Sequence, residues 1–317
     1  MISGFTFLRN ASTLYYPFIE SLRSILPLVD EFVVVLGEGN PGDRTREMLH
    51  EMGSPKLKII PSVWDPGRYR GGSIYAQQTD LAKAACRGDW LFYLQGDEVI
   101  HEQDFPVIRK ACETFMHDQR VEGFVFDFLH FYGDYRHFFR DHSWYKKEIR
   151  IIRNLPDIHS WRDAQSFRYI PEFKDYDYFR IAGTRKLNCI SLPARVFHYG
   201  WVKPPAMMTQ KNFEAVKNYN KPGYDQFQGR FDYGRLDRAR VFEGNHPAVM
   251  KEWMDQLNWQ DLLRFSGPVA LNRPLMKHEK LRYRALNFIE KTFLGGHVIG
   301  GFQNYKLIQA APDGAHV

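Results

Sequence analysis

Cysteine is scarce in this sequence. Its three cysteines, Cys86, Cys112 and Cys189, stand far apart among 317 residues and are odd in number. A disulfide framework needs paired cysteines and a zinc cluster needs them at close spacing, so the sequence predicts neither. This usage is typical of a protein that folds in a reducing compartment such as the cytoplasm.

Long apolar runs are absent as well. No run approaches the roughly 18 residues that cross a bilayer, so no membrane-spanning helix is predicted. Met1 leads directly into a strand-like segment, ISGFTFL, without the basic region and cleavage site of a secretory leader. We therefore expect a cytoplasmic protein, and we leave open a peripheral position at the inner face of the membrane.

The chain also lacks dense blocks of one charge. Its 43 basic and 37 acidic residues give a net charge of +6, and the two signs are interspersed. A positive excess of this size suits anionic small molecules or a membrane surface as partners. The dense Lys/Arg block that would favour nucleic acid is missing, so we do not expect nucleic acid as a partner. Hydrophobic residues at 44% and aromatic residues at 15% predict a sizeable folded core.

The clearest functional pattern lies between Asp89 and Phe105. The apolar run from Trp90 to Leu94 predicts a strand buried on both faces, as in a parallel sheet covered by helices. The strand stops at QGDE, and ligands of open α/β sheets bind outside the carboxyl ends of the strands. Two adjacent carboxylates there favour a hard cation such as Mg²⁺ or Mn²⁺. The alternative interpretation is an acidic surface turn.

Strand and helix patterns alternate through the first half of the chain. The strand patterns stand at residues 2–8, 31–37, 57–60 and 90–94, with helical patterns between them and after the last. This repeated order predicts a mostly parallel sheet with right-handed crossovers. Beyond residue 120, further strand patterns predict that the sheet continues as a mixed one. The predicted fold class is therefore α/β.

The last third of the chain is expected to be a helical appendage. We predict one domain at residues 1–203, followed at 204–317 by a lid loop and a helical extension packed on the same domain. The lid is the stretch 219–237, which is rich in Gly, Asp, Tyr and Arg. The segment 277–306 mixes Lys and Arg with Leu, Phe and Ile, which suits either a helix that covers the core or one that lies on an anionic membrane.

In their order, these motifs resemble the GT-A fold of the family 2 glycosyltransferases, in particular the bacterial enzymes that build surface polysaccharides. TFLRN looks like the first strand and its nucleotide-facing turn, and VVVLGEGNPGDRTRE looks like the second strand and its acidic loop. LQGDE looks like the motif that holds the metal and the diphosphate of a nucleotide sugar. Three positions depart from the family pattern. Gln95 stands where an acidic residue is common, Arg44 replaces the usual glycine after Asp43, and Glu38 stands where a smaller Asp or Asn is frequent.

The resemblance implies a metal-dependent, inverting glycosyltransferase that uses a nucleotide-sugar donor, with a UDP-sugar favoured. The acceptor would be a glycan or a lipid-linked glycan in the assembly of bacterial cell-surface polysaccharide. Mn²⁺ or Mg²⁺ would be held by Asp97, Glu98 and His198. The expected donor-binding residues are Asn10, Asp43, Arg68, Arg70, Gln95, Gly96 and Lys203.

Asp163 is the expected catalytic base, because it stands between the acidic motif and His198, where the family places that carboxylate. The alternative is that Asp163 caps a helix or pairs with Arg162 or Arg168. His198 likewise has an alternative, as a histidine satisfied within the core.

Three other functions stay open at this point. A nucleotidyltransferase shares a similar sheet and metal site, but it usually carries a Gly-rich basic loop directly after its first strand, where this chain has LRNAS. A nucleic-acid binding module would follow from the positive charge. A non-catalytic relative that only binds nucleotide would follow from Gln95.

Overall fold

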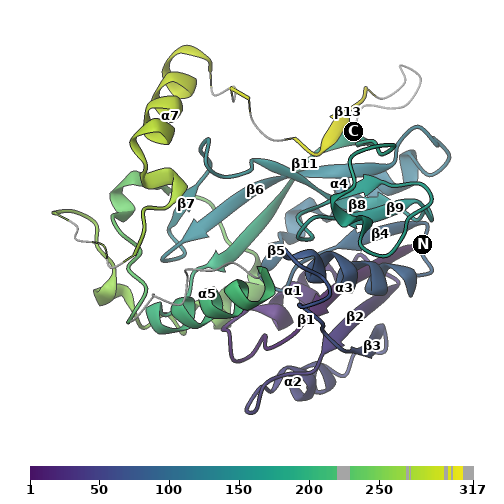
Figure 1. The fold of residues 1–317 in the computed structure, drawn as a ribbon, viewed down its shortest axis with the longest axis horizontal. Coiled ribbons are helices and arrows are strands. Elements are labelled where there is room, and N and C mark those ends of the chain that lie inside the picture. Colours follow the sequence, from purple (N-terminus) through teal and green to yellow (C-terminus); the bar gives the residue numbers. More distant parts are fainter. Residues whose placement is uncertain (220–228, 269–270, 272, 296–298, 301–302, 310–317) are drawn as a thin grey trace.

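The computed structural model describes residues 1–219, 229–268, 271, 273–295, 299–300 and 303–309. Within these residues, eleven strands form one large sheet with helices on both sides (Figure 1). A separate two-stranded hairpin consists of β9 (Ile158–Trp161) and β10 (Ser166–Tyr169).

The amino-terminal part of the sheet is parallel. Its strands lie in the order β4-β1-β2-β3, with bounds β1 (Ile2–Leu8), β2 (Glu31–Gly37), β3 (Leu57–Ser62) and β4 (Trp90–Tyr93). Every residue of β2 and β4 is buried, because helices cover both faces. The continuous apolar runs in the sequence reflect this double burial.

Alternate residues of these strands pack on opposite faces of the sheet. Phe32, Val34 and Leu36 join one core cluster, whereas Val33 and Val35 join another. The first cluster includes residues of α1 (Phe18–Ile25), α2 (Thr45–Glu51) and α4 (Phe105–Thr114). The second includes residues of α3 (Ser73–Ala84) and of the β9–β10 hairpin.

The other half of the sheet is mixed. β8 (Lys147–Arg153) runs antiparallel to β4 and to β6 (Gly123–Tyr132), and β11 (Leu187–Trp201) runs parallel to β6. Short strands complete this half: β5 (Glu98–Ile100), β7 (His137–Phe139), β12 (Arg240–Val241) and β13 (Tyr305–Leu307). The predicted α/β fold class, a mixed sheet with a parallel part flanked by helices, is confirmed.

The longest strand of this half is interrupted in its pairing. β11 pairs with β6 irregularly between Ser191 and Arg195. Pro193 lies in this gap and has no N–H to donate to the ladder. Farther along the chain, a 3-10 turn at Ala248–Met250 leads into the short helix α6 (Lys251–Met254).

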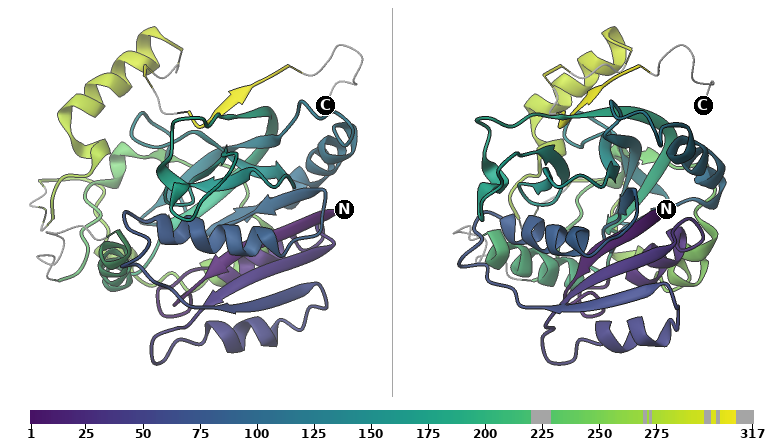
Figure 2. Two further views of the ribbon diagram at one scale, coloured as in Figure 1. Left: turned by 45° about the vertical axis from the view of Figure 1, so that its right-hand side comes forward. Right: turned by 90° about the vertical axis from the view of Figure 1, so that its right-hand side faces the viewer.

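The segment after residue 203 lies against the same sheet. It contains α5 (Pro205–Tyr219) and α7 (Leu281–Phe293), and its strands β12 and β13 pair with β7 and β11. Figure 2 shows α7 standing at the edge of the molecule. Residues 220–228 of the predicted lid lie outside the described residues, and the domain boundary at 203 stays a prediction. None of the described helices is long and apolar enough to cross a membrane.

Candidate active site

A pocket of about 330 Å³ opens at the carboxyl ends of the parallel strands. It is lined by the segment after β1, the segment after β4, the end of β11 and one face of α5. Six residues expected in the site contribute to the lining: Asn10, Gln95, Gly96, Asp97, Asp163 and His198. Both the position and the size of this pocket are typical of small-molecule sites.

A buried carboxylate and two basic side chains meet in this pocket. Asp97 Oδ2 lies 3.6 Å from His198 Nε2 and 3.8 Å from Lys211 Nζ. Burial alone would raise the pKa of Asp97, but His198, Lys211 and Lys203 hold it well below its ordinary value. Asp97 is therefore ionised at neutral pH, and its negative charge faces the pocket.

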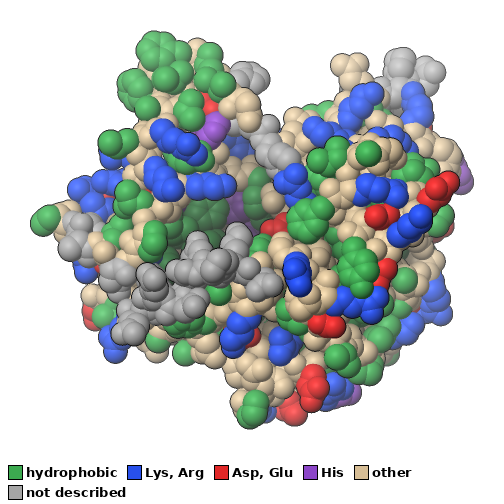
Figure 3. Space-filling view, in the orientation of Figure 1, with side chains coloured by type: hydrophobic (Ala, Val, Ile, Leu, Met, Phe, Trp, Pro, Cys, Tyr) green, Lys and Arg blue, Asp and Glu red, His purple; other side chains and the backbone are tan. Residues whose placement is uncertain are grey.

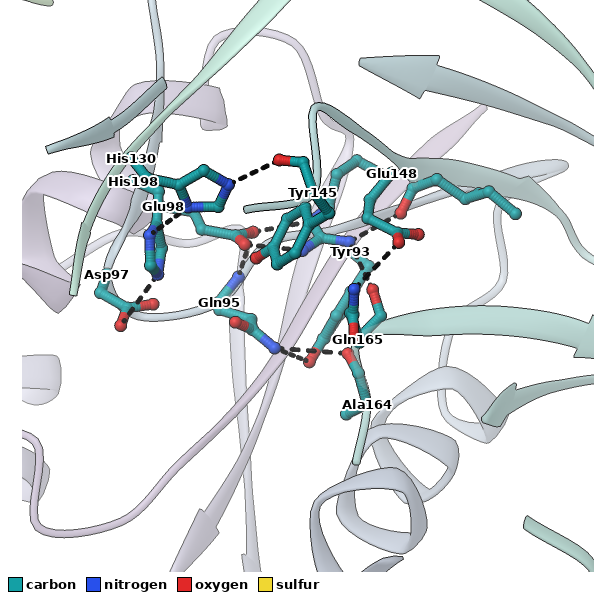
Figure 4. A network of polar contacts seen from close by, with 12 residues as sticks. Tyr93, Gln95, Asp97, Glu98, His130, Tyr145, Glu148, Ala164, Gln165 and His198 are labelled. Carbon is teal, nitrogen blue, oxygen red and sulfur yellow. Dashed lines mark hydrogen bonds and ion pairs between the residues drawn. The ribbon is translucent and has the colours of Figure 1, made fainter. Parts of the chain in front are cut away.

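His130 determines which nitrogen of His198 faces Asp97 (Figure 4). The two histidines lie opposite each other on the parallel strands β6 and β11. His130 Nε2 lies 2.8 Å from the carbonyl oxygen of Tyr145, which can only accept, so this nitrogen donates. Burial, together with His198, lowers the pKa of His130 well below its ordinary value, so its Nδ1 accepts from His198 Nδ1 at 3.0 Å. Nε2 of His198 therefore faces Asp97. It donates to the carboxylate when the ring is protonated, which is the form that lowers the pKa of Asp97, and it carries a lone pair when the ring is neutral.

This pair of donors fits a divalent cation that also binds the substrate. Asp97 would supply a carboxylate oxygen and a neutral His198 an imidazole lone pair, and the contact with His130 would fix the orientation of that ring, as outer partners of metal ligands do. Within the described part of the chain, no group of three or more His, Cys, Asp or Glu residues is arranged to hold a metal. Two protein ligands suit an ion whose other ligands are phosphate oxygens and water.

Glu98, expected as a metal ligand, points away from the pocket. Its neighbour Asp97 lies in the turn before β5 and faces the pocket. Glu98 begins β5, and both its carboxylate oxygens accept from Arg150, at 2.6 and 2.7 Å. Both side chains of this ion pair are fully buried. Glu98 is therefore engaged in the core and is not available to a cation.

Asn10 and Gln95 line the pocket and also hold its walls together. Asn10 Oδ1 accepts from the backbone N–H of Asn40 at 2.7 Å, which joins the segments after β1 and β2. Gln95 Nε2 donates to the carbonyl oxygen of Ala164 at 3.3 Å and to the Tyr93 hydroxyl at 3.2 Å. The two amide side chains thus contribute to the shape of the site.

Gly96 is needed for space rather than for a special backbone angle. A Cβ atom at this position would lie 2.8 Å from Cδ2 of Leu8. A side chain at residue 96 would therefore push against the Leu8 side chain where the segment after β4 passes the end of β1.

Three other expected donor-binding residues, Asp43, Arg68 and Arg70, lie outside the lining. Asp43 Oδ1 accepts from the hydroxyls of Ser12 and Thr45, both at 2.7 Å, at the start of α2. Arg68 pairs with Asp175, and Arg70 is exposed. Both arginine side chains are therefore exposed outside the pocket, which corrects their expected place in the donor site.

Lys203 is also outside the lining, because it is completely buried beneath the segment after β1. Its ammonium donates to the carbonyl oxygens of Leu14 and Tyr15, at 2.8 and 2.5 Å, and lies over the Tyr16 ring. Burial lowers the pKa of Lys203 well below its ordinary value. Its role here is to hold the pocket wall, so the expected direct contact with a donor is not seen.

Asp163 lines the pocket from the loop between β9 and β10. It does not cap a helix, so that alternative is wrong. Its neighbours Arg162 and Ala164 have φ angles of 59° and 62°, a left-handed conformation uncommon for residues other than glycine. The Tyr219 hydroxyl donates to Asp163 Oδ2 at 2.7 Å. The carboxylate is therefore restrained by Tyr219 at the wall of the pocket.

Lys211 and an aromatic wall also line the pocket, and neither was among the residues expected there. Lys211 lies on α5, is half-buried near the Trp201 ring and donates to the carbonyl oxygen of Gly200 at 2.8 Å. Trp64 and Tyr75 form the wall, with ring centroids 5.7 Å apart. A lysine in a helical pattern and aromatics in an aromatic-rich chain carry no distinctive signal, so only the tertiary structure shows them.

No protein-family model matches the chain, and no curated protein matches it. Among solved structures, S. aureus TarS 1-349 in complex with UDP is similar over 71% of this chain and 68% of that chain, with 16% identity and a TM-score of 0.38. GalNAc-T7 with UDP, GalNAc and Mn²⁺ is similar over 62% and 43%, with 12% identity and a TM-score of 0.37.

A nucleotidyl transferase from Methanothermobacter thermautotroptrophicus is similar over 48% of this chain and 70% of that chain, with 15% identity and a TM-score of 0.28. In a longer TarS chain, the similar part is 39% of the length. These similarities are too distant to assign a family. The fold described above therefore rests on the strand order and the register of this chain.

Proposed function

We propose that this protein is a glycosyltransferase that transfers a sugar from a nucleotide-sugar donor to a glycan or a lipid-linked acceptor. The observation that carries the proposal is the meeting of Asp97, His198 and Lys211 in a pocket at the carboxyl ends of the parallel strands. The preference for a UDP-sugar, the inverting course and a place in bacterial surface-polysaccharide assembly rest on the resemblance of the sequence motifs.

The two parts of the pocket suit the two parts of a nucleoside diphosphate. The rings of Trp64 and Tyr75 offer a surface on which a base can stack. Lys211 offers a half-buried positive charge to the diphosphate. Asp97 and His198 would hold Mn²⁺ or Mg²⁺, which when bound neutralises charge on the diphosphate leaving group.

Asp163 is the proposed base. A glycosyl transfer needs a group that removes the proton of the acceptor hydroxyl, and an ionised carboxylate in a partly dry pocket is suited to this role. Tyr219 restrains the carboxylate through its hydrogen bond to Oδ2. The orientation of Asp163 is therefore set before the acceptor arrives.

Thermal unfolding with a panel of nucleoside diphosphates, each with and without Mn²⁺, tests the donor site. A ligand that binds the folded state raises its stability by an amount that grows with ligand concentration over Kd. We expect one diphosphate to raise the unfolding temperature in a Mn²⁺-dependent way. Asp97→Ala should lose this response, and the exposed variant Asp255→Ala should keep it.

The chemistry is tested separately by incubation with nucleotide sugars. A glycosyltransferase releases the nucleoside diphosphate, whereas a nucleotidyltransferase forms or uses pyrophosphate. Asp163→Asn is expected to bind the donor normally and to lose transfer. No thermal response to any diphosphate at millimolar concentration would refute the proposed donor site.

A further inference from the structure

The helix α7 exposes its apolar side chains to solvent. Leu281, Phe288 and Phe293 are 77%, 64% and 71% exposed, and Ile289 is 40% exposed. Helical spacing brings these residues to one broad side of the helix. Figure 3 shows hydrophobic side chains gathered at the top left, over the position of α7. An ordinary surface helix turns its apolar side toward the core, whereas α7 turns its apolar side toward solvent.

The side of α7 that faces the protein is polar instead. Glu290 is buried, and its Oε1 lies 2.6 Å from His142 Nδ1 and accepts from the backbone N–H of Ile299 at 2.8 Å. Asn287 Oδ1 accepts from the backbone N–H of His142 at 3.1 Å. Polar contacts thus fix the orientation of the helix, which leaves the apolar side unpartnered within the described residues.

The charges around this apolar side are of one sign. The basic residues between 277 and 293 are all exposed: Lys277, Lys280, Arg282, Arg284 and Lys291. The acidic residues in the same range, Glu279 and Glu290, pair with Arg273 and His142. The outward surface of α7 therefore combines large apolar side chains with positive charge only.

We propose that α7 docks this protein on an anionic lipid surface, with Phe288 and Phe293 inserted at the level of the headgroups. A helix with an apolar side flanked by lysine and arginine lies in the plane of such an interface. A second copy of the chain would bring the same cluster of cations against itself, which disfavours a symmetric dimer through this side.

Docking of this kind goes beyond the proposed transferase activity and does not depend on it. If both proposals hold, α7 brings the pocket to an acceptor that is carried by a lipid.

Sedimentation of the full chain with lipid vesicles tests the proposal. We expect binding to vesicles of phosphatidylcholine mixed with phosphatidylglycerol, weak binding to phosphatidylcholine alone, and loss of binding as salt rises. Phe288→Ser with Phe293→Ser should lower the affinity by about tenfold or more per phenylalanine. Arg284→Gln with Lys291→Gln should lower it by about fivefold per charge.

The controls change similar side chains far from α7. Val63 and Ile181 are 83% and 63% exposed, so Val63→Ser with Ile181→Ser matches the apolar variant. Arg46→Gln with Lys58→Gln, on α2 and β3, matches the charge variant. All variants change exposed side chains, so their unfolding temperatures should stay close to that of the parent.

Two results would overturn the proposal: no sedimentation with anionic vesicles, or equal sedimentation of the Phe288/Phe293 variant. Self-association that this variant abolishes, without vesicle binding, would assign the apolar side to a second copy and would also overturn it. The vesicle assay contains no nucleotide, so its failure leaves the donor site untouched.

Discussion

Glu148, on β8 behind the pocket, should make the stability of the protein depend on pH. Its side chain is fully buried, and Gln165 Nε2 donates to its Oε1 at 3.1 Å (Figure 4). Burial raises the pKa of Glu148 from an ordinary value of 4.5 to about 7, although Arg150 opposes the shift. The folded protein therefore keeps this carboxyl protonated at pH values where the unfolded chain has lost the proton.

The sign of the effect follows from proton binding. Between about pH 4.5 and about pH 7 the unfolded chain binds fewer protons than the folded protein at Glu148, so the free energy of unfolding falls as pH rises. Above about pH 7 the loss is complete. At about 1.4 kcal/mol per pKa unit, it amounts to about 3 kcal/mol.

Glu148→Gln removes this titration and keeps a carbonyl oxygen for Gln165. We expect the variant to equal the parent near pH 4.5 and to be more stable by about 3 kcal/mol near pH 8. Urea unfolding at several pH values measures the difference. Glu113→Gln, an exposed glutamate on α4, is the matched control and should follow the parent at every pH. Parallel pH profiles for the parent and Glu148→Gln would refute the reasoning.

Two further predictions concern the walls of the pocket. Arg150→Met leaves Glu98 buried and unpaired, so the free energy of unfolding measured in urea should fall by about 3 to 5 kcal/mol. Adding Glu98→Leu to the same chain should restore most of this loss. An unchanged free energy of unfolding in Arg150→Met would contradict the burial of this pair. Gly200→Ala places a methyl group against the Asp97 carboxylate and 2.8 Å from His198 Nε2. The Mn²⁺-dependent rise in unfolding temperature with a nucleoside diphosphate should therefore disappear. An unchanged rise would show that the site tolerates the methyl group.

The framework of the fold was predictable from local sequence patterns. A strand buried on both faces needs a continuous apolar run, so EFVVVLG and WLFYL indicate β2 and β4 directly. Where such a strand stops at polar residues, its end reaches the ligand-binding edge of the sheet. This rule led to Asp97, which lines the pocket.

The partners of Asp97 were only partly predictable. His198 lies in the site because β5 pairs with β11, and its orientation depends on His130 across the β6–β11 ladder. Lys211 arrives on α5, far along the chain. No local pattern encodes these meetings, because they depend on which strands become neighbours.

By itself, the sequence determined the α/β framework and the edge at which Asp97 stands, since burial and backbone periodicity are local properties that each strand carries. Only the tertiary structure decided that Asp97 faces the pocket while Glu98 faces Arg150 in the core, and that Lys203 holds a wall. The direction of a side chain and the identity of its partner depend on strand pairing between distant segments, which alternation along one strand cannot specify.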